Sequence, residues 1–260
     1  SYSECEDDLN RICTDIENCA GDTSIALSMI SDDSFYMEMK KDYAPEMVTA
    51  FIRLNGATVG CVANRSEVYT DGEKTATYDA ALTAAGCEKA AAFVNFCNAF
   101  EIPVLTLVNV DGYKNCKCNE KKIAKAAARL TYAFANADVP KVTVVVGKAN
   151  GTAGLTMNSK SIGSDIVYAW KNAKIGVMEA APAVKIMYAD EIAKADNAAA
   201  LINEKAAQYN EMQASALAAA KRGYVDDIIE ASETRQRVVA AFEMLFTKRE
   251  DRPSKKHGTI

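Results

Sequence analysis

Histidine is nearly absent from the sequence, since its single residue, His257, lies in the polar C-terminal tail. A Ser-His-Asp triad needs a histidine beside its nucleophile, and structural zinc sites take four Cys or His ligands. The triad of a hydrolase or peptidase is therefore not available. Cys116-Lys117-Cys118 resembles half of a metal site, but no second Cys pair follows it, so we expect no metal.

Long apolar runs and an excess of basic residues are also missing. No stretch reaches the roughly 20 apolar residues that a membrane-spanning helix needs, and the N-terminus lacks the order of a signal peptide. A formal net charge of -5 argues against a nucleic-acid interface. The eight cysteines are scattered through ordinary globular sequence, which favours free thiols in a reducing compartment. We expect a cytoplasmic protein with no nucleic-acid partner and no direct membrane insertion.

The order of apolar patterns predicts an α/β fold. Asn55-Gly56 between two short apolar runs indicates a β-hairpin. Strands then alternate with helices, which implies a mostly parallel sheet. We expect strands at 102–110, 142–146, 165–170 and 174–178, and helices at 87–100, 122–136, 180–188 and 197–221. Residues 1–20 are acidic and without a clear period, so we expect a linker-like N-terminal segment followed by one domain at 21–260.

Three predicted helices have identifiable inward residues. Those of the helix at 87–100 are Phe93, Phe96, Cys97 and Phe100, and those of the helix at 122–136 are Ile123, Ala126, Ala127, Leu130 and Phe134. Ser232 is expected to cap a last helix with Val238, Phe242 and Leu245 inward.

The segment at 142–160 carries the strongest chemical signal, because a buried strand runs through Gly147, Gly151 and Gly154 into a short helix. Helix N-termini leave backbone N–H groups unpaired, so the amides of Thr152 and Ala153 are candidate donors to an oxyanion. The spacing fits neither the phosphate loop nor the dinucleotide fingerprint. Spacing alone favours the simpler interpretation, in which the glycines only permit a sharp strand-to-helix turn.

Several motifs agree in order and spacing along nearly the whole chain. They are EIPVLTLVNVDGY at 101–113, VPKVT at 139–143 and MNSK at 157–160, with shorter ones at 57–64, 88–91, 168–170, 223–227, 247–249 and 256–258. Together they resemble the biotin-dependent acyl-CoA carboxyltransferase family. The resemblance implies a crotonase/ClpP-like ββα superhelix.

Family members carry two crotonase-like halves, and this chain resembles the C-terminal one, because DDLNR at 7–11 resembles the segment that joins them. Its start at Ser1 instead of Met is consistent with a domain cut there. The implied partners are an N-terminal carboxyltransferase half that holds the acyl-CoA, a biotin carboxyl carrier protein, and further copies in a homo-oligomer. The implied reaction moves a carboxyl group between carboxybiotin and the α-carbon of a coenzyme A thioester.

The resemblance also assigns site residues. Thr152 and Ala153 fall where the family uses a Gly-Ala amide pair, here expected to face the ureido oxygen of biotin. Gly151, Gly154, Leu155 and Asn150 are implied to line the biotin or substrate pocket. Leu155 falls where relatives tune acyl-chain preference, although a core leucine is an equal alternative.

The sequence departs from the family pattern at this site. Thr152 replaces a glycine, and Asn150 and Gly154 each replace an aromatic residue. The loop at 114–121 is rich in Cys and Lys where relatives are rich in Gly and Pro. Backbone donation survives these changes, whereas the pocket shape is expected to differ.

Two alternatives to this enzyme remain open. A crotonase-fold hydratase would need paired carboxylates near a coenzyme A pocket. A non-catalytic crotonase-fold assembly or binding module would keep the fold without the donors. The sequence does not separate carboxylase from decarboxylase direction.

Overall fold

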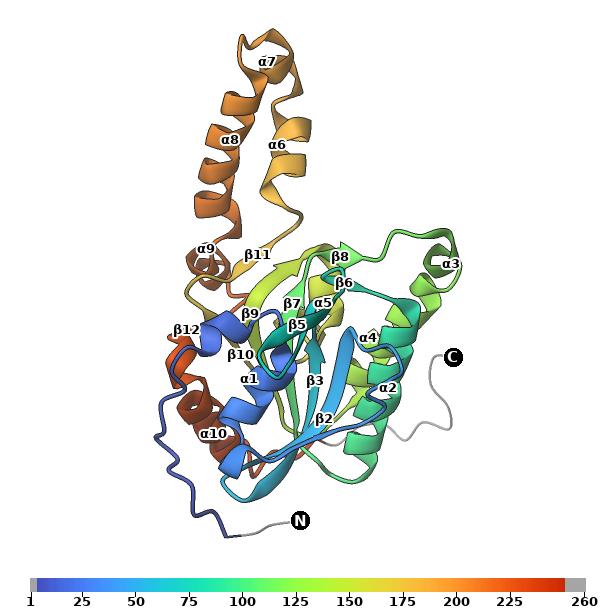
Figure 1. The fold of residues 1–260 in the computed structure, drawn as a ribbon, viewed down its shortest axis with the longest axis vertical. Helices are drawn as coiled ribbons and strands as arrows, with labels where there is room; N and C mark the ends of the chain where they lie inside the picture. The colour runs from blue at the N-terminus through green and yellow to red at the C-terminus, as the bar shows by residue number, and fades with distance from the viewer. Residues whose placement is uncertain (1–3, 251–260) are drawn as a thin grey trace.

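A mixed sheet of eight strands forms the centre of the protein in the computed structural model, which describes residues 4–250 (Figure 1). The strand order is β1-β2-β3-β7-β9-β10-β12, and β11 pairs with β9. Strands β1 to β3 pair antiparallel, and the pairings from β3 to β12 are parallel, which confirms the predicted sheet. The strands are Tyr36–Glu38 (β1), Met47–Leu54 (β2), Ala57–Asn64 (β3), Val104–Val110 (β7), Lys141–Asn150 (β9), Ile166–Trp170 (β10), Lys174–Gly176 (β11) and Asp227–Ile229 (β12).

The remaining elements surround this sheet. Two small strand pairs are β4 with β5, which is antiparallel, and β6 with β8, which is parallel. Their bounds are Glu67–Thr70 (β4), Glu73–Thr77 (β5), Ala81–Leu82 (β6) and Gly112–Tyr113 (β8). The α-helices are Thr23–Ile30 (α1), Ala84–Ala99 (α2), Lys117–Glu120 (α3), Ile123–Asn136 (α4), Gly151–Thr156 (α5), Ala180–Met187 (α6), Ala189–Lys194 (α7), Ala198–Tyr209 (α8), Ala216–Lys221 (α9) and Thr234–Met244 (α10).

The sheet separates two apolar cores, one on each face. In β7, Val104, Val108 and Val110 join the core under α2 and α4, whereas Leu105 and Leu107 join the core under α1 and α10. Side chains alternate between the faces of a strand, so a strand covered on both faces reads as a continuous apolar run. This is why the strand predicted at 102–110 is confirmed with a start only two residues later.

The predicted hairpin is confirmed in register. Leu54 faces Ala57 at the end of the β2–β3 ladder, and the two turn residues, Asn55 and Gly56, have φ values of 49° and 72°. Positive φ at both positions is the geometry that the Asn-Gly pair favours. The carboxylate of Asp32 accepts hydrogen bonds from both turn amides, at 3.2 and 2.8 Å.

The predicted face of the helix at 87–100 is partly wrong. The helix α2 begins earlier, at Ala84, because the side chain of Thr83 caps it by accepting from Gly86 N. Phe93 and Cys97 are buried as expected, but Phe96 and Phe100 are 46% and 64% exposed. The buried face follows the smaller residues Cys87, Ala90 and Val94 instead. The predictions for α4 and α6 are confirmed within one residue at each end.

The single helix predicted at 197–221 is wrong, since the segment is broken at Ser215. The helix α8 gives way to a π-helical turn, Asn210–Ala214, before α9 starts. Ser215 has extended backbone angles, and its hydroxyl accepts from Ala218 N to cap α9. A serine inside an alanine run offers the backbone this alternative to helix continuation.

Ser232 does not cap the last helix. It lies in a 3-10 turn, Ala231–Glu233, and α10 begins after it without a side-chain cap. The Ser232 carbonyl accepts a hydrogen bond from Cys13 N at 2.9 Å. Val238 is fully buried, and Phe242 and Leu245 pack against the same core, so the predicted inward face is confirmed.

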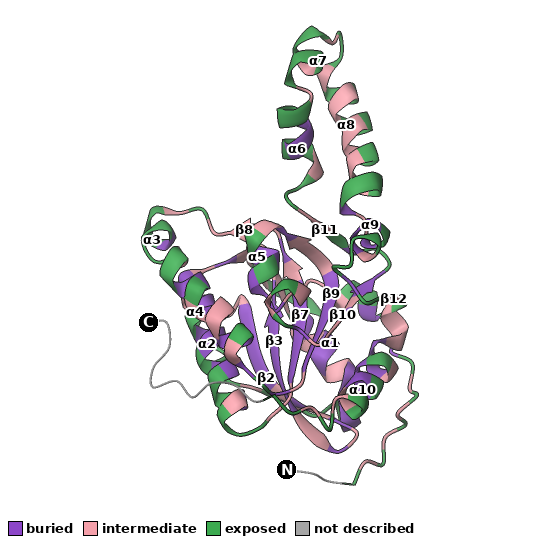
Figure 2. Ribbon diagram, turned by 180° about the vertical axis from the view of Figure 1, so that it is seen from behind, coloured by how far each residue is buried: buried purple, intermediate pink, exposed green. Residues whose placement is uncertain are grey.

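The helices α6, α7 and α8 form an arm that projects from the sheet (Figure 1). Most of its surface is intermediate or exposed (Figure 2), and the apolar side chains Ile186 and Met187 are at least 60% exposed. The arm connects β11 to α9, and Ile175 and Gly176 of β11 line the cavity described below.

The N-terminal segment lies against the body in the part that the structure describes. Cys13 and Ile16 are 2% and 1% exposed and belong to the core under α1 and α10. Whether a domain boundary falls after residue 20 stays a prediction. The polar C-terminal tail from residue 251 onward, with His257 and the motif at 256–258, lies outside the described residues.

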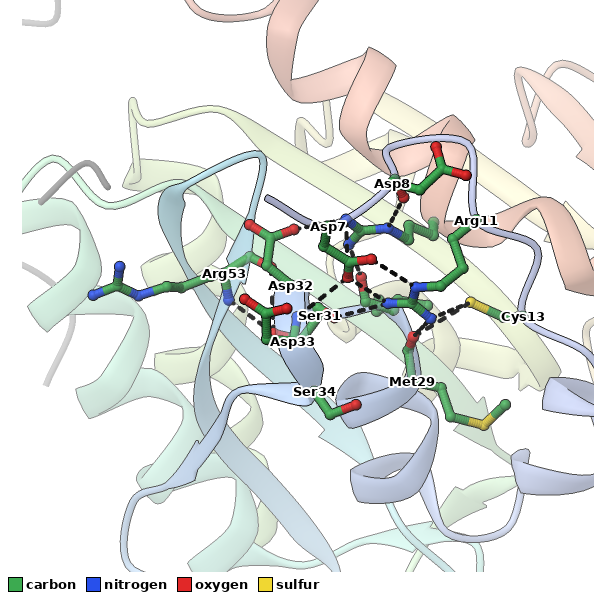
Figure 3. Close-up of polar contacts among 12 residues, drawn as sticks. Asp7, Asp8, Arg11, Cys13, Met29, Ser31, Asp32, Asp33, Ser34 and Arg53 are labelled. Carbon is green, nitrogen blue, oxygen red and sulfur yellow. Dashed lines mark hydrogen bonds and ion pairs between the residues drawn. The ribbon is translucent and has the colours of Figure 1, made fainter. Parts of the chain in front are cut away.

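An ion cluster fastens this N-terminal segment to the body. Arg11 donates to both carboxylate oxygens of Asp7, and the side chains of Arg11, Asp7 and Asp32 converge (Figure 3). The guanidinium of Arg235, which is fully buried, donates to Asp32 Oδ1 at 2.8 Å and to Ile30 O at 2.6 Å. The hydrogen bond from Arg11 lowers the pKa of Asp7 below its ordinary value.

Candidate functional site

A cavity of about 800 Å³ opens at the C-terminal end of the parallel strands. It is lined by the end of β9, the short helix α5, β8, β11 and residues from α8 to β12. In open α/β sheets, ligands bind outside the carboxyl ends of the strands. All six predicted site residues line it, namely Asn150, Gly151, Thr152, Ala153, Gly154 and Leu155.

The strand-to-helix transition is sharper than the sequence suggested. Residues 147–150 continue β9 instead of forming a loop, and α5 starts directly at Gly151. Gly151 has a φ of +57°, and a Cβ on Gly154 would lie 2.7 Å from the carbonyl carbon of Ala149. Both positions therefore require glycine for the turn itself, as the purely structural interpretation expected.

The two candidate amides differ in exposure. Thr152 is exposed, whereas Ala153 is 0% exposed while still bordering the cavity. Within residues 4–250, neither backbone N–H donates a hydrogen bond to a protein acceptor. Buried backbone N–H groups without a partner are rare in folded proteins. The first turn of α5 thus carries donors to which residues 4–250 supply no acceptor.

Leu155 is not the core residue that one interpretation expected. Its side chain is 45% exposed and lines the cavity. Residues on either side of it, Gly154 and Thr156, are buried, so α5 turns Leu155 away from the core. The interpretation in which this position shapes a pocket fits the structure.

A charged group paired with Asp111, which lines the cavity, was missed by the sequence analysis. Lys148 Nζ contacts Asp111 Oδ2 at 3.0 Å and forms a second ion pair with Glu179. Burial lowers the pKa of Lys148, but hydrogen bonds from its ammonium to Glu179 and Asp111 outweigh this and raise it overall. The same ion pair lowers the pKa of Glu179. Lys148 therefore stays charged.

Asn150 is held by the same carboxylate. Its Nδ2 donates to Asp111 Oδ1 at 3.1 Å, and the residue is only 4% exposed. Asp111 thus fixes β9 against the end of β7. The sequence carried a signal for this contact, because Asp111 directly follows a buried strand, and side chains at adjacent parallel strand ends lie close together.

The residues on the far side of the cavity were also not predicted from the sequence. It is lined by Tyr209, Gln213, Arg222 and Tyr224, which lie in or after α8 and around α9. Arg222 Nη1 donates to Gln213 O at 2.8 Å. These residues are distant in sequence from 150–155, and the break at Ser215 that brings them together was not predicted.

Nowhere in residues 4–250 do three or more His, Cys, Asp or Glu side chains converge so that they could bind a metal ion. None of the helices in this range combines the length and apolarity required to cross a bilayer.

Comparison with known proteins gives matches over nearly the whole chain. Residues 3–260 match the family described as carboxyl transferase domain. The chain is 39% identical over 270 residues to the methylmalonyl-CoA decarboxylase subunit alpha of Propionigenium modestum, covering 98% of this chain and 49% of that protein. It is 40% identical over 240 residues to the methylmalonyl-CoA carboxyltransferase 12S subunit of Propionibacterium freudenreichii subsp. shermanii, covering 92% and 44%. The chain therefore spans about half the length of these relatives.

Solved structures agree with this comparison. A transcarboxylase 12S structure with methylmalonyl-coenzyme A and methylmalonic acid bound superposes with a TM-score of 0.88 at 38% identity, covering 99% of this chain and 49% of that one. The beta subunit of geranyl-CoA carboxylase from P. aeruginosa shares the fold, with a TM-score of 0.73 at 22% identity, covering 100% and 48%. The predicted crotonase-like α/β fold is confirmed.

Proposed function

Because this chain belongs to the carboxyl transferase family, we propose that it forms the biotin-facing half of a carboxyltransferase site. The complete site moves a carboxyl group between carboxybiotin and the α-carbon of an acyl-CoA. The names of the relatives favour an acyl group of the methylmalonyl and propionyl class. Since the chain spans about half of those relatives, a second half that holds the acyl-CoA is part of the proposal.

The observation that carries this proposal is the pair of amides at Thr152 and Ala153 beside the cavity, for which the described part of the chain offers no acceptor. Bound carboxybiotin supplies the carboxyl group, and its ureido oxygen becomes negatively charged when that group leaves. The N–H groups of Thr152 and Ala153 are positioned to donate to an oxygen of this kind. Preorganised donors in a site shielded from water stabilise such a charge strongly.

Other residues of the chain hold these amides in place. Gly151 and Gly154 allow α5 to turn directly off β9 and pack against Ala149. Asp111 holds Asn150, the residue before α5, and Lys148 at the cavity edge. Leu155, exposed to the cavity, is the residue through which this chain would shape acyl-chain preference.

The proposed partners are a biotin carboxyl carrier protein, the second carboxyltransferase half and further copies of the same assembly. The related transcarboxylase 12S structure is described as a hexamer and as a multienzyme core, which supports an oligomer. We place the assembly in the cytoplasm. The direction of transfer follows from the partner, because one site catalyses both directions.

The test is to combine this chain with the N-terminal half of a 12S-type relative and to measure biotin-dependent decarboxylation of methylmalonyl-CoA. Ala153→Pro deletes one donor, and we expect a loss of about a hundredfold in kcat, as for single donors in other oxyanion sites. The matched control is Thr152→Gly, which keeps both amides and restores the residue that the resemblance implies. Far-UV circular dichroism verifies that both variants are folded.

A second measurement does not depend on activity. Free biotin should slow hydrogen exchange at the Thr152 and Ala153 amides, because hydrogen bonding protects a backbone N–H. A rate that Ala153→Pro leaves unchanged would show that this turn has no catalytic role. Amides that biotin leaves unprotected would favour a non-catalytic binding module.

A further inference from the structure

The loop between β8 and α4 brings two thiols together at the surface. Cys116 Sγ and Cys118 Sγ lie 3.1 Å apart. Cys118 is exposed and Cys116 is partly exposed, whereas Cys13, Cys61, Cys87 and Cys97 are buried. Among residues 4–250, this is the one pair of cysteines that share a hydrogen bond. The proposed carboxyl transfer uses neither of them.

The backbone on both sides of the pair is anchored. The Cys116 carbonyl accepts hydrogen bonds from Asn119 N and Glu120 N, each at 3.0 Å, in the first turn of α3. The side chain of Asn119, which is 6% exposed, donates to Lys114 O and accepts from Ala84 N, both at 2.7 Å. Asn119 therefore ties the loop to the start of α2. Two thiols held this close lose little conformational entropy when they form a bond.

We propose that Cys116 and Cys118 form a redox-active dithiol that low-molecular-weight disulfides convert reversibly into an intramolecular disulfide. The Cys116 thiolate attacks one sulfur of the small disulfide, which gives a mixed disulfide and releases one thiolate. The Cys118 thiol then loses its proton to solvent and attacks Cys116 Sγ, which releases the second thiolate. Two cysteine thiols are oxidised to one disulfide, and one small disulfide is reduced to two thiols.

The local electrostatics favour Cys116 as the attacking group. The hydrogen bond from the Cys118 thiol, and then that from Asn119 N, lower the pKa of Cys116 below the ordinary value of a thiol. A thiolate is the reactive form of cysteine. By contrast, burial raises the pKa of Cys13, Cys87 and Cys97. Burial also raises the pKa of the partly exposed Cys5 and Cys19, so the electrostatics favour oxidation at this loop.

The position of the loop gives the modification a consequence. Tyr113 immediately precedes Lys114, lines the cavity and contacts Thr156 Oγ1 of α5 at 3.2 Å. A covalent link at the start of α3 constrains the loop that directly follows Tyr113. Oxidation therefore stiffens one edge of the cavity without touching the candidate amides.

The test uses the full chain with the partly exposed Cys5 and Cys19 replaced by Ser, incubated with oxidised glutathione. Mass spectrometry should show the loss of two hydrogen atoms, in a peptide that contains both Cys116 and Cys118. Cys118→Ser in the same background is the matched control, and it should instead accumulate a glutathione adduct on Cys116. Dithiothreitol should reverse both products.

Ring closure should also be about tenfold faster in the folded chain than in urea, because the fold holds the two sulfurs together. A chain with both cysteines that accumulates a stable glutathione adduct on Cys116 would overturn the proposal. So would equal closure rates in the folded and unfolded chain.

Discussion

Replacing Arg235 by Met should destabilise the fold strongly, because it leaves Asp32 buried without its cationic partner. Arg235 is fully buried, and the side chain of Asp32 is only 6% exposed. Breaking a buried ion pair by removing one partner costs about 3–5 kcal/mol. Asp32 keeps two backbone donors, Asn55 N and Gly56 N, so we expect a value near the lower end.

A loss of about 3 kcal/mol corresponds to a decrease in Tm of roughly 6–12 °C for a chain of this size. The assay is equilibrium unfolding in urea followed by far-UV circular dichroism. The matched control is Arg237→Met on the same helix, because the side chain of Arg237 is 47% exposed and its ion pairs are 3.5 and 3.6 Å long. This control should change stability by less than about 0.5 kcal/mol.

The double variant Arg235→Met, Asp32→Asn separates the buried charge from lost packing. If the unpaired carboxylate causes the loss, the second substitution should recover part of the stability, since it removes the charge. The reasoning is refuted if the free energy of unfolding of Arg235→Met lies within about 1 kcal/mol of that of the unmodified chain. It is also refuted if both arginine variants are equally destabilised.

Two further predictions concern a buried lysine and a tightly packed glycine. Burial lowers the pKa of Lys89 to about 8 in the folded state, against 10.5 for the free side chain, so the unfolded chain binds more protons between these values. The free energy of unfolding should therefore rise with pH across this window, and below it should be lower and constant. In urea unfolding between pH 7.5 and about 10.5, Lys89→Met should remove this rise. An identical slope in both proteins would contradict this assignment. Gly154→Ala forces a Cβ to 2.7 Å from the Ala149 carbonyl carbon and should lower the free energy of unfolding by about 1–3 kcal/mol. At the control position Gly112 an added Cβ meets no atom within 4 Å, so Gly112→Ala should not lower it. Equal urea midpoints for the two variants would disprove the packing argument.

The fold was largely predictable because its strands and helices have regular apolar patterns. The run at 104–110 reads as a strand covered on both faces, and Asn55-Gly56 specifies a turn by its own backbone preferences. The errors arose where side-chain size or a polar side chain overrode the pattern. Phe96 lies outside the buried stripe of α2, and Ser215 breaks an alanine-rich helix by capping the next one.

The candidate site was predictable only along one segment. Residues 150–155 were found because the glycines and the helix start are contiguous in sequence. Lys148, Asp111 and Glu179 were missed as a group because their contact depends on how three separate segments meet. Arg222 and Tyr224 reach the cavity only because the chain returns from the arm at that point.

The strand β9 pairs with β7 along one edge, and with β10 and then β11 along the other. The residues that lead into α5 are therefore clamped from both sides. The backbone at the Thr152 and Ala153 amides is therefore already ordered. A ligand that binds there loses little free energy in ordering the protein. Affinity at this site should depend on the shape of the ligand far more than on conformational change in the protein.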